Sequence, residues 1–290
     1  MVCNLCPRRC NALRTEREGG GYCGMPSLPV VARAALHPWE EPPISGERGS
    51  GTVFFSGCSL GCIFCQNGSI SQGRFGRTIS VERLREIFLE LIAQGAHNIN
   101  LVNPTHFSHA VIEALGEPLP VPVVWNSGGY DKAETLRVLE GKVQVYLPDL
   151  KYLDADTAQA CSDAPDYPQV AAAAIREMVR QTGPYVIENG LMTRGVIIRH
   201  LILPGRVAGA KAVMDWISGT FPPHTVMLSL MSQYVPFGRA RETPGFDRTL
   251  RPSEIRAAEV YFSALDLDGF TQELLSAAEG FVPEFDLTGV

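Results

Sequence analysis

The stretch GTVFFSGCSLGCIFC, residues 51–65, joins a short apolar run to three closely spaced cysteines. Its first six residues are rich in aromatic and β-branched side chains, which predicts a buried strand. Cys58, Cys62 and Cys65 follow within one tight loop. A cubane iron–sulfur cluster is normally held by four cysteines, so three thiolates would leave one iron open for another ligand. This loop therefore predicts a metal centre with an open position.

Short apolar runs alternate with helix-like stretches after this loop. Such alternation is typical of βα units and a parallel sheet. It predicts strands at 51–56, 98–102, 121–125, 143–147, 196–203 and 225–230. Helices are expected after a Ser80 cap and at 108–115, 133–139, 170–181, 208–217 and 253–265. Six units fit a partial barrel or a doubly wound sheet, and the count alone does not separate them.

Composition limits the class of protein. The chain has 290 residues, 45% of them hydrophobic and 19% charged, which excludes a disordered chain. Its net charge of −6 argues against a general nucleic-acid binder. We find no run of 18 apolar residues and no signal-peptide pattern at the N-terminus. We therefore expect a soluble, cytoplasmic protein without a membrane span.

Residues 1–50 differ from the rest of the chain, because they hold four cysteines and show little helical or strand periodicity. Close thiols in a reducing compartment favour metal over disulfides. Four thiolates satisfy structural zinc and an auxiliary iron–sulfur cluster equally well. We predict a small cysteine-rich module whose fold is stabilised by bound zinc or by such a cluster. Its ligands would be Cys3, Cys6, Cys10 and Cys23.

The spacing Cys-x3-Cys-x2-Cys, with Phe64 before the last cysteine, resembles the signature loop of radical S-adenosylmethionine (SAM) enzymes. Other segments are similar to the pyruvate formate-lyase activating enzyme family, in a divergent branch with an N-terminal four-cysteine module. These segments are CQN at 65–67, DLK at 149–151, RHLILPG at 199–205 and HPWEEP at 37–42.

The resemblance implies an α/β fold, a partial (β/α)6 TIM-type barrel over residues 51–265, preceded by the cysteine-rich module (1–50) and followed by a C-terminal extension (266–290). It also implies a [4Fe–4S] cluster on Cys58, Cys62 and Cys65. SAM would bind the open iron, be cleaved after one-electron reduction, and yield a 5′-deoxyadenosyl radical that abstracts hydrogen from a substrate.

The residues expected to bind SAM follow the predicted strands. Family members carry Gly-Gly-Glu after the second strand, where this chain has the stretch 103–106, so the amine site must differ. Arg199 and His200 alternate on one strand, so only one can face the barrel, and we select His200. The full set is Phe64, Asn103, Thr105, His106, Asn126, Ser127, Asp149, Lys151 and His200.

Three functions stay open at the level of sequence. The resemblance implies an activase that abstracts hydrogen from a backbone glycine of a glycyl radical enzyme. The alternatives are a radical SAM enzyme that acts on a small molecule or another macromolecule, and a metal-binding interaction or electron-carrier protein without SAM turnover. A flavodoxin or ferredoxin is the expected electron donor. Cys161 stands apart from both clusters and is interpreted as an ordinary thiol.

Overall fold

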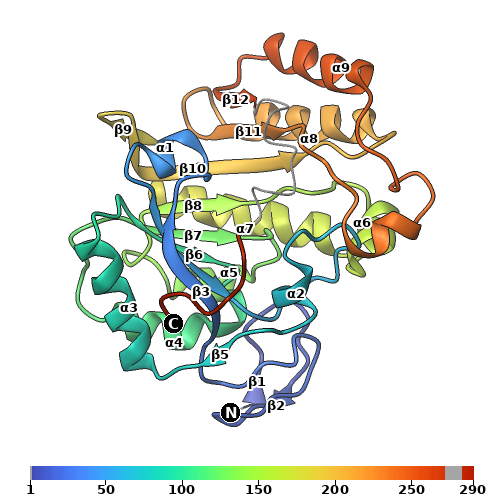
Figure 1. The fold of residues 1–290 in the computed structure, drawn as a ribbon. Coiled ribbons are helices and arrows are strands. Elements are labelled where there is room, and N and C mark those ends of the chain that lie inside the picture. Colours follow the sequence, from blue (N-terminus) through green and yellow to red (C-terminus); the bar gives the residue numbers. More distant parts are fainter. Residues whose placement is uncertain (1, 272–282) are drawn as a thin grey trace.

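The computed structural model describes residues 2–271 and 283–290. A ten-stranded, mostly parallel sheet forms the centre of this part of the chain (Figure 1). The parallel strands are β4 (Ser50–Phe55), β6 (Ile99–Val102), β7 (Val123–Ser127), β8 (Val145–Pro148), β10 (Leu191–Leu201), β11 (Met227–Met231) and β12 (Gly269–Thr271). The first six confirm the predicted βα strands. Every residue of β4 is buried, because helices cover one face and the barrel interior the other.

Helices follow the strands at the predicted places. Ser80 caps α3 (Val81–Ala93) by accepting a hydrogen bond from the Arg83 N–H. The apolar face of this helix is buried against the sheet, as its 3.6-residue period requires. The other long helices are α4 (Ser108–Leu115), α6 (Ala155–Ser162), α7 (Tyr167–Thr182), α8 (Val207–Thr220) and α9 (Pro252–Ser263), and α5 (Ala133–Arg137) is shorter.

An eight-residue strand, β3 (Val30–His37), was not predicted. It runs antiparallel to β4 and pairs on its other side with β5 (Arg77–Thr78). The main path of the sheet is β12-β11-β10-β8-β7-β6-β4-β3-β5, with β9 (Val186–Glu188) beside β10. In the described residues the path thus ends at β12 and β5 without closing, which is a partial barrel.

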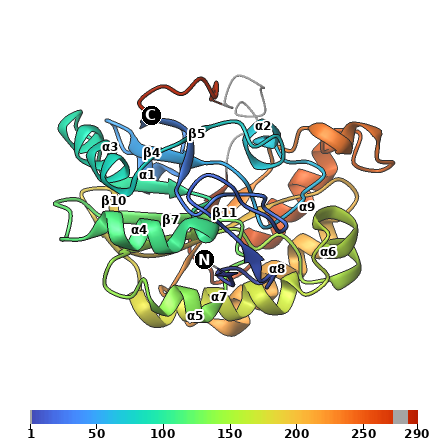
Figure 2. The ribbon, with the colours of Figure 1, turned by 90° about the horizontal axis from the view of Figure 1, so that it is seen from below.

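The C-terminal residues lie along β3, on the side of the sheet away from α4, α5 and α7 (Figures 1 and 2). The Ala34 N–H donates to the Thr288 carbonyl at 2.8 Å, and the Leu287 N–H donates to the Ala32 carbonyl at 3.0 Å. These bonds hold 283–290, the described end of the predicted C-terminal extension, against the barrel. Residues 272–282 of that extension lie outside the described residues.

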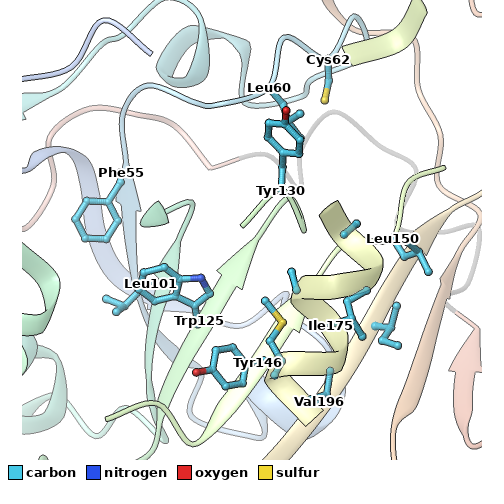
Figure 3. Packing of buried hydrophobic residues seen from close by; sticks show 14 of the residues in the cluster. Phe55, Leu60, Cys62, Leu101, Trp125, Tyr130, Tyr146, Leu150, Ile175 and Val196 are labelled. Carbon is cyan, nitrogen blue, oxygen red and sulfur yellow. The ribbon is translucent and has the colours of Figure 1, made fainter. Parts of the chain in front are cut away.

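Two layers of core pack on the two faces of the sheet. The larger one lies between the sheet and the helices, and Figure 3 shows Trp125, Tyr146 and Val196 within it. On the inner face, α1 (Pro42–Ser45) lies against β10, and fully buried Ile44 packs among apolar side chains of the strands. The short helix therefore fills one end of the barrel interior.

The N-terminal segment contributes the two-stranded pair β1 (Val2–Cys3) and β2 (Ala12–Leu13). It lies at the lower edge of the molecule in Figure 1. β3 lies within residues 1–50, the predicted cysteine-rich module, and pairs with the strands of the main sheet. No helix among the described residues is long and apolar enough to cross a membrane.

Candidate functional site

Residues 58–65, hereafter the cysteine loop, follow β4 at its carboxyl end. Hydrogen bonds to the end of α6 fix the loop backbone: the Gly61 N–H donates to the Ser162 carbonyl at 3.3 Å and the Ile63 N–H to the Cys161 carbonyl at 2.9 Å. Gly57, the residue just before the loop, has a φ of 78°, and a Cβ there would lie 2.3 Å from the Met25 Cγ. The turn therefore requires glycine.

Each thiol of the cysteine loop has a polar neighbour. The Leu60 N–H donates to the Cys58 Sγ at 3.3 Å, the Cys62 Sγ lies 3.0 Å from the Ser162 Oγ, and the Cys65 Sγ lies 3.3 Å from the Ser71 Oγ. Burial holds the pKa of Cys58 and Cys65 above its ordinary value, and the hydrogen bonds to their sulfurs offset only part of this rise. Donors aimed at sulfur favour the thiolate, which is the form that binds metal.

A cavity of about 300 Å³ opens beside this loop and enters the barrel interior. Its volume is at the lower end of the range for small-molecule sites. Six predicted site residues line it, from the cysteine loop and from the ends of β7 and β8: Cys62, Phe64, Cys65, Asn126, Asp149 and Lys151. The Phe64 ring packs edge-on to Tyr234, with ring centroids 5.9 Å apart. The structure thus brings cysteines and polar strand ends to one cavity.

An ion network crosses the wall of this cavity. The Arg199 Nε donates to the Asp149 Oδ1 at 2.9 Å and the Arg199 Nη2 to the Asn126 Oδ1 at 2.7 Å, while the Lys151 Nζ donates to the Asp149 Oδ2. Burial opposes ionisation of Asp149, but the Arg199 and Lys151 cations outweigh it and hold the pKa of that carboxyl below its ordinary value. The carboxylate is therefore charged and fixed in place.

The alternation on β10 is opposite to our expectation. Arg199 lines the cavity, whereas His200 is buried on the other face of the sheet and its Nδ1–H donates to the Leu150 carbonyl at 2.7 Å. Burial is the main cause of its lowered pKa, about 4, so His200 is a neutral core residue. The prediction was wrong because the alternation fixes only that the two residues differ, and the pairing of Arg199 with Asp149 decides which one faces inward.

The residues expected to replace Gly-Gly-Glu do not line the cavity. The Asn103 Oδ1 accepts from the Cys58 Sγ at 3.6 Å, beside the cysteine loop. The Thr105 hydroxyl donates to the Asp131 Oδ1 at 2.6 Å, and the Ser127 hydroxyl donates to the other oxygen of the same buried carboxylate. Thr105 and Ser127 therefore join two loops through Asp131, which sequence reasoning missed.

His106 is also turned away from the cavity that was expected for it. The side chain is fully buried, and its Nε2–H donates to the Ser56 carbonyl at 2.7 Å. It lines a second, much smaller cavity of about 10 Å³. Burial is the main cause of its lowered pKa, about 4, so the imidazole is neutral.

The four N-terminal cysteines surround that second cavity. We call residues 2–29, the part of the predicted 1–50 module that carries these four cysteines, the cysteine module. The Tyr22 N–H donates to the Cys10 Sγ at 3.4 Å, and the Arg14 guanidinium, 1% exposed, donates to the Cys3 Sγ at 3.3 Å. The Cys3 and Cys10 sulfurs thus have donors beside them, as the sulfurs of the cysteine loop do.

Neither group of cysteines forms a closed metal site in this structure. In the described ranges, no three His, Cys, Asp or Glu side chains are grouped closely enough to hold a metal ion. What the fold supplies is two sets of thiols, each carried on one short segment and each with hydrogen-bond donors at sulfur. The chemistry of both donor sets fits thiolate-bound metal.

The cysteine module packs against the cysteine loop. The Arg8 Nε donates to the Ser59 carbonyl at 2.8 Å, and its Nη2 donates to the Ser162 carbonyl at 3.2 Å. The same guanidinium lies 3.8 Å from the centre of the Tyr22 ring, whose hydroxyl would lie 2.5 Å from a Cβ at Gly61. These contacts are outside the large cavity, whose lining includes no residue of the module.

Two further carboxylates line the large cavity, Glu40 and Glu41. They belong to the HPWEEP segment that carried part of the family resemblance. Their place in that segment was the only sign in the sequence that they could belong to the site. Cys161 is buried in the core that includes Tyr152 and is not among the residues lining either cavity. This placement agrees with an ordinary thiol.

No protein-family model matches the chain. Among solved structures, SuiB of Streptococcus suis bound to S-adenosylmethionine superposes with a TM-score of 0.53 at 14% identity over 76% of this chain and 50% of SuiB. Methylornithine synthase (PylB) gives 0.52 at 16% identity over 80% of this chain and 63% of PylB. The chain thus spans half the length of SuiB and under two thirds of PylB. These likenesses confirm the predicted α/β partial-barrel fold.

A sequence relative covers more of the chain. The uncharacterized protein MJ0674 of Methanocaldococcus jannaschii is 30% identical over 279 residues, which span 92% of this chain and 75% of MJ0674. Identity at this level over most of both sequences indicates common descent and a common fold. By this similarity the chain belongs to the family of MJ0674.

Proposed function

We propose that this protein is a radical SAM enzyme that holds a [4Fe–4S] cluster on Cys58, Cys62 and Cys65. The observation that carries the proposal is the cavity lined at once by Cys62, Cys65 and the polar ends of β7 and β8. The fold likeness to SuiB, a protein whose structure contains bound SAM, supports it. When bound, the cluster supplies one-electron reduction of SAM, which yields methionine and a 5′-deoxyadenosyl radical that takes a hydrogen atom from the substrate.

The chain's own residues bind and orient SAM in this proposal. Asp149 is fixed by Arg199 and Lys151, so it offers a rigid acceptor to hydroxyl or amine groups. Asn126, whose Oδ1 is held by Arg199, presents its amide from the neighbouring strand. Phe64, within the cysteine loop, supplies an apolar surface for the adenine.

The test is anaerobic reconstitution, reduction, addition of SAM and chromatography of 5′-deoxyadenosine. We expect product from the unaltered chain and from Cys161→Ala, a matched loss of a buried thiol that does not line the cavity. The triple variant Cys58→Ala, Cys62→Ala, Cys65→Ala should give none. Equal product from the triple variant, or none from the unaltered chain, contradicts the proposal and favours a metal-binding or electron-carrier protein.

The substrate divides this proposal in two. An activase like those of glycyl radical enzymes would take hydrogen from a backbone glycine, and its gene would be expected beside that of its partner enzyme. The charges that line the cavity favour the alternative, a small molecule or a macromolecule other than a glycyl radical enzyme, because an uncharged glycine backbone needs no carboxylates. A flavodoxin or ferredoxin is the proposed source of the electron.

We propose that the cysteine module also binds metal, either zinc or an auxiliary iron–sulfur cluster. Its four thiols line one small cavity and have a buried arginine beside them. Metal analysis of the triple variant described above isolates this site. More than about one iron per chain in that variant would identify a cluster, since structural zinc sites hold a single ion, and about one zinc would identify a structural site.

A further inference from the structure

The large cavity joins two ends of the barrel. The cysteine loop follows the carboxyl end of β4, whereas Glu40 and Glu41 follow β3, whose last residue His37 pairs with Ser50 at the start of β4. Just beyond them α1 fills the interior with Ile44. The two carboxylates therefore enter the cavity from the end opposite the cysteines.

The charges that line the cavity do not balance. Three carboxylates, those of Glu40, Glu41 and Asp149, face two cations, those of Lys151 and Arg199. Lys151 and Arg199 both bond to Asp149, and the Arg199 Nη1 lies 3.6 Å from the Glu40 Oε2. His37 also lines the cavity, and burial, aided by Arg33, lowers its pKa, so it adds no charge near neutral pH. When all three carboxyl groups are ionised, one negative charge is left without a cation.

Glu41 is the residue that carries this excess. It is 2% exposed, and its Oε2 has no hydrogen-bond partner among the described residues. Burial is the main cause that raises its pKa to about 7; Arg199 lowers the pKa, and the charge and side chain of Glu40 raise it further. Near neutral pH, Glu41 therefore holds either a proton or the charge that a bound cation would neutralise. A buried carboxylate oxygen without a donor is costly unless a ligand supplies one. Its neighbour Glu40 accepts from the Asn126 amide at 3.3 Å and is already oriented.

We propose that Glu40 and Glu41 bind a protonated amine of the substrate, and that the substrate is a primary ammonium compound or a side chain that carries one. This inference rests on the proposed function for the reaction, but the binding itself does not need the cluster. The ammonium brings three donors. One of them satisfies the Glu41 Oε2, and its charge offsets the third carboxylate. The amine end of the substrate would thus lie deep in the barrel, with the rest of the molecule directed toward the cysteine loop.

SAM also carries an ammonium group, so the experiment has one arm for each source. In the first arm, ligand-observed NMR measures binding of n-butylammonium to the full chain, with n-butanol and butyrate as neutral and anionic controls. The variants are Glu41→Gln and Glu40→Gln, which keep shape and remove charge. Glu113→Gln, on the exposed face of α4, is the matched control. In the second arm, calorimetry measures the SAM affinity of the cluster-loaded enzyme and of the same variants.

We expect the unaltered chain and Glu113→Gln to bind butylammonium in preference to both controls. Either cavity variant should lose at least about tenfold in affinity for butylammonium. In Glu41→Gln the SAM affinity should stay within about twofold of that of the unaltered chain. A thermal melt shows whether either variant fails to fold, and in that case the other variant still tests the proposal. The proposal would be overturned if the unaltered chain did not prefer butylammonium to butanol and butyrate. It would also be overturned if both cavity variants bound butylammonium as tightly as the unaltered chain does. A matching loss of SAM affinity would also overturn it, by assigning the pair to SAM.

The two proposals can fail separately. If amine binding depends on Glu41 but no 5′-deoxyadenosine forms, the proposed radical reaction is contradicted and the proposed ammonium site is supported. Formation of 5′-deoxyadenosine without amine binding would do the reverse.

Discussion

The cysteine loop and the cysteine module use the same side chain in different surroundings. The loop faces a cavity of about 300 Å³, and the module surrounds one of about 10 Å³. The loop rests on backbone bonds to α6, whereas the module has little regular structure, a two-residue strand pair and one bridge, and is tied to the barrel mainly by side-chain hydrogen bonds such as those of Arg8 and Thr135. The loop is therefore held by the barrel and open to a ligand, and we expect the module to depend more on a metal bound by its thiols.

The largest expected effect tests the dependence of the module on metal. In Cys6→Ala we expect residues 7–27 to unfold, because metal bound by four thiolates contributes on the order of 10 kcal/mol to small modules. Limited proteolysis should cut this segment at least about 100-fold faster, while the barrel stays resistant. Cys161→Ala serves as the control. Unchanged cleavage would mean that protein contacts alone hold the module.

The next effect concerns the ion network in the wall of the large cavity, which the cysteine loop faces. Asp149→Asn leaves Arg199 and Lys151 buried without their carboxylate, and we expect a loss of roughly 3 kcal/mol in the free energy of unfolding at pH 7. Urea titration measures it. Because the folded pKa of Asp149 lies below its ordinary 3.8, its contribution is present above that pH and is lost as the pH falls through the folded value. The variant should lack this part of the acid dependence.

A third change separates the two regions at their contact. Arg8→Met removes the bonds to the Ser59 and Ser162 carbonyls, so the cysteine loop loses a positioning contact. We expect the rate of 5′-deoxyadenosine formation to fall about tenfold, as for other residues that orient metal ligands. A shift in the absorption spectrum of the loop-bound cluster should accompany it. Exposed Arg17→Met is the matched control, and a rate equal to that control would show that module and loop act independently.

The smallest change tests whether Thr105 binds SAM, as the sequence predicted, or only supports the fold. Thr105→Val removes the bond to Asp131 and should cost about 1–2 kcal/mol of unfolding free energy. SAM affinity, measured by calorimetry on the cluster-loaded enzyme, should not change. A weakened affinity with normal stability would restore the original prediction.

The sequence-based prediction of the fold succeeded where local pattern decides. Six strands and the helices after them follow from apolar runs, helical periodicity and the Ser80 cap. β3 escaped because VVARAALH is rich in alanine, which has low strand propensity. That strand forms because β4, β5 and residues 287–288 supply its hydrogen bonds. Residues 287–288 are distant in sequence and β5 has only two residues, so neither partner of β3 could be recognised from the local sequence.

The sequence by itself determined the cysteine spacings and the order of the βα units, because both depend on neighbours a few residues apart. Only the tertiary structure decided that Arg199 rather than His200 faces the cavity, that His106 lies beside the cysteine module, and that Glu41 lies in the barrel. These placements depend on contacts between residues 50 or more positions apart, such as Arg199 with Asp149 and His106 with Ser56. Local spacing limits where a side chain can point, and the packed barrel selects among those directions.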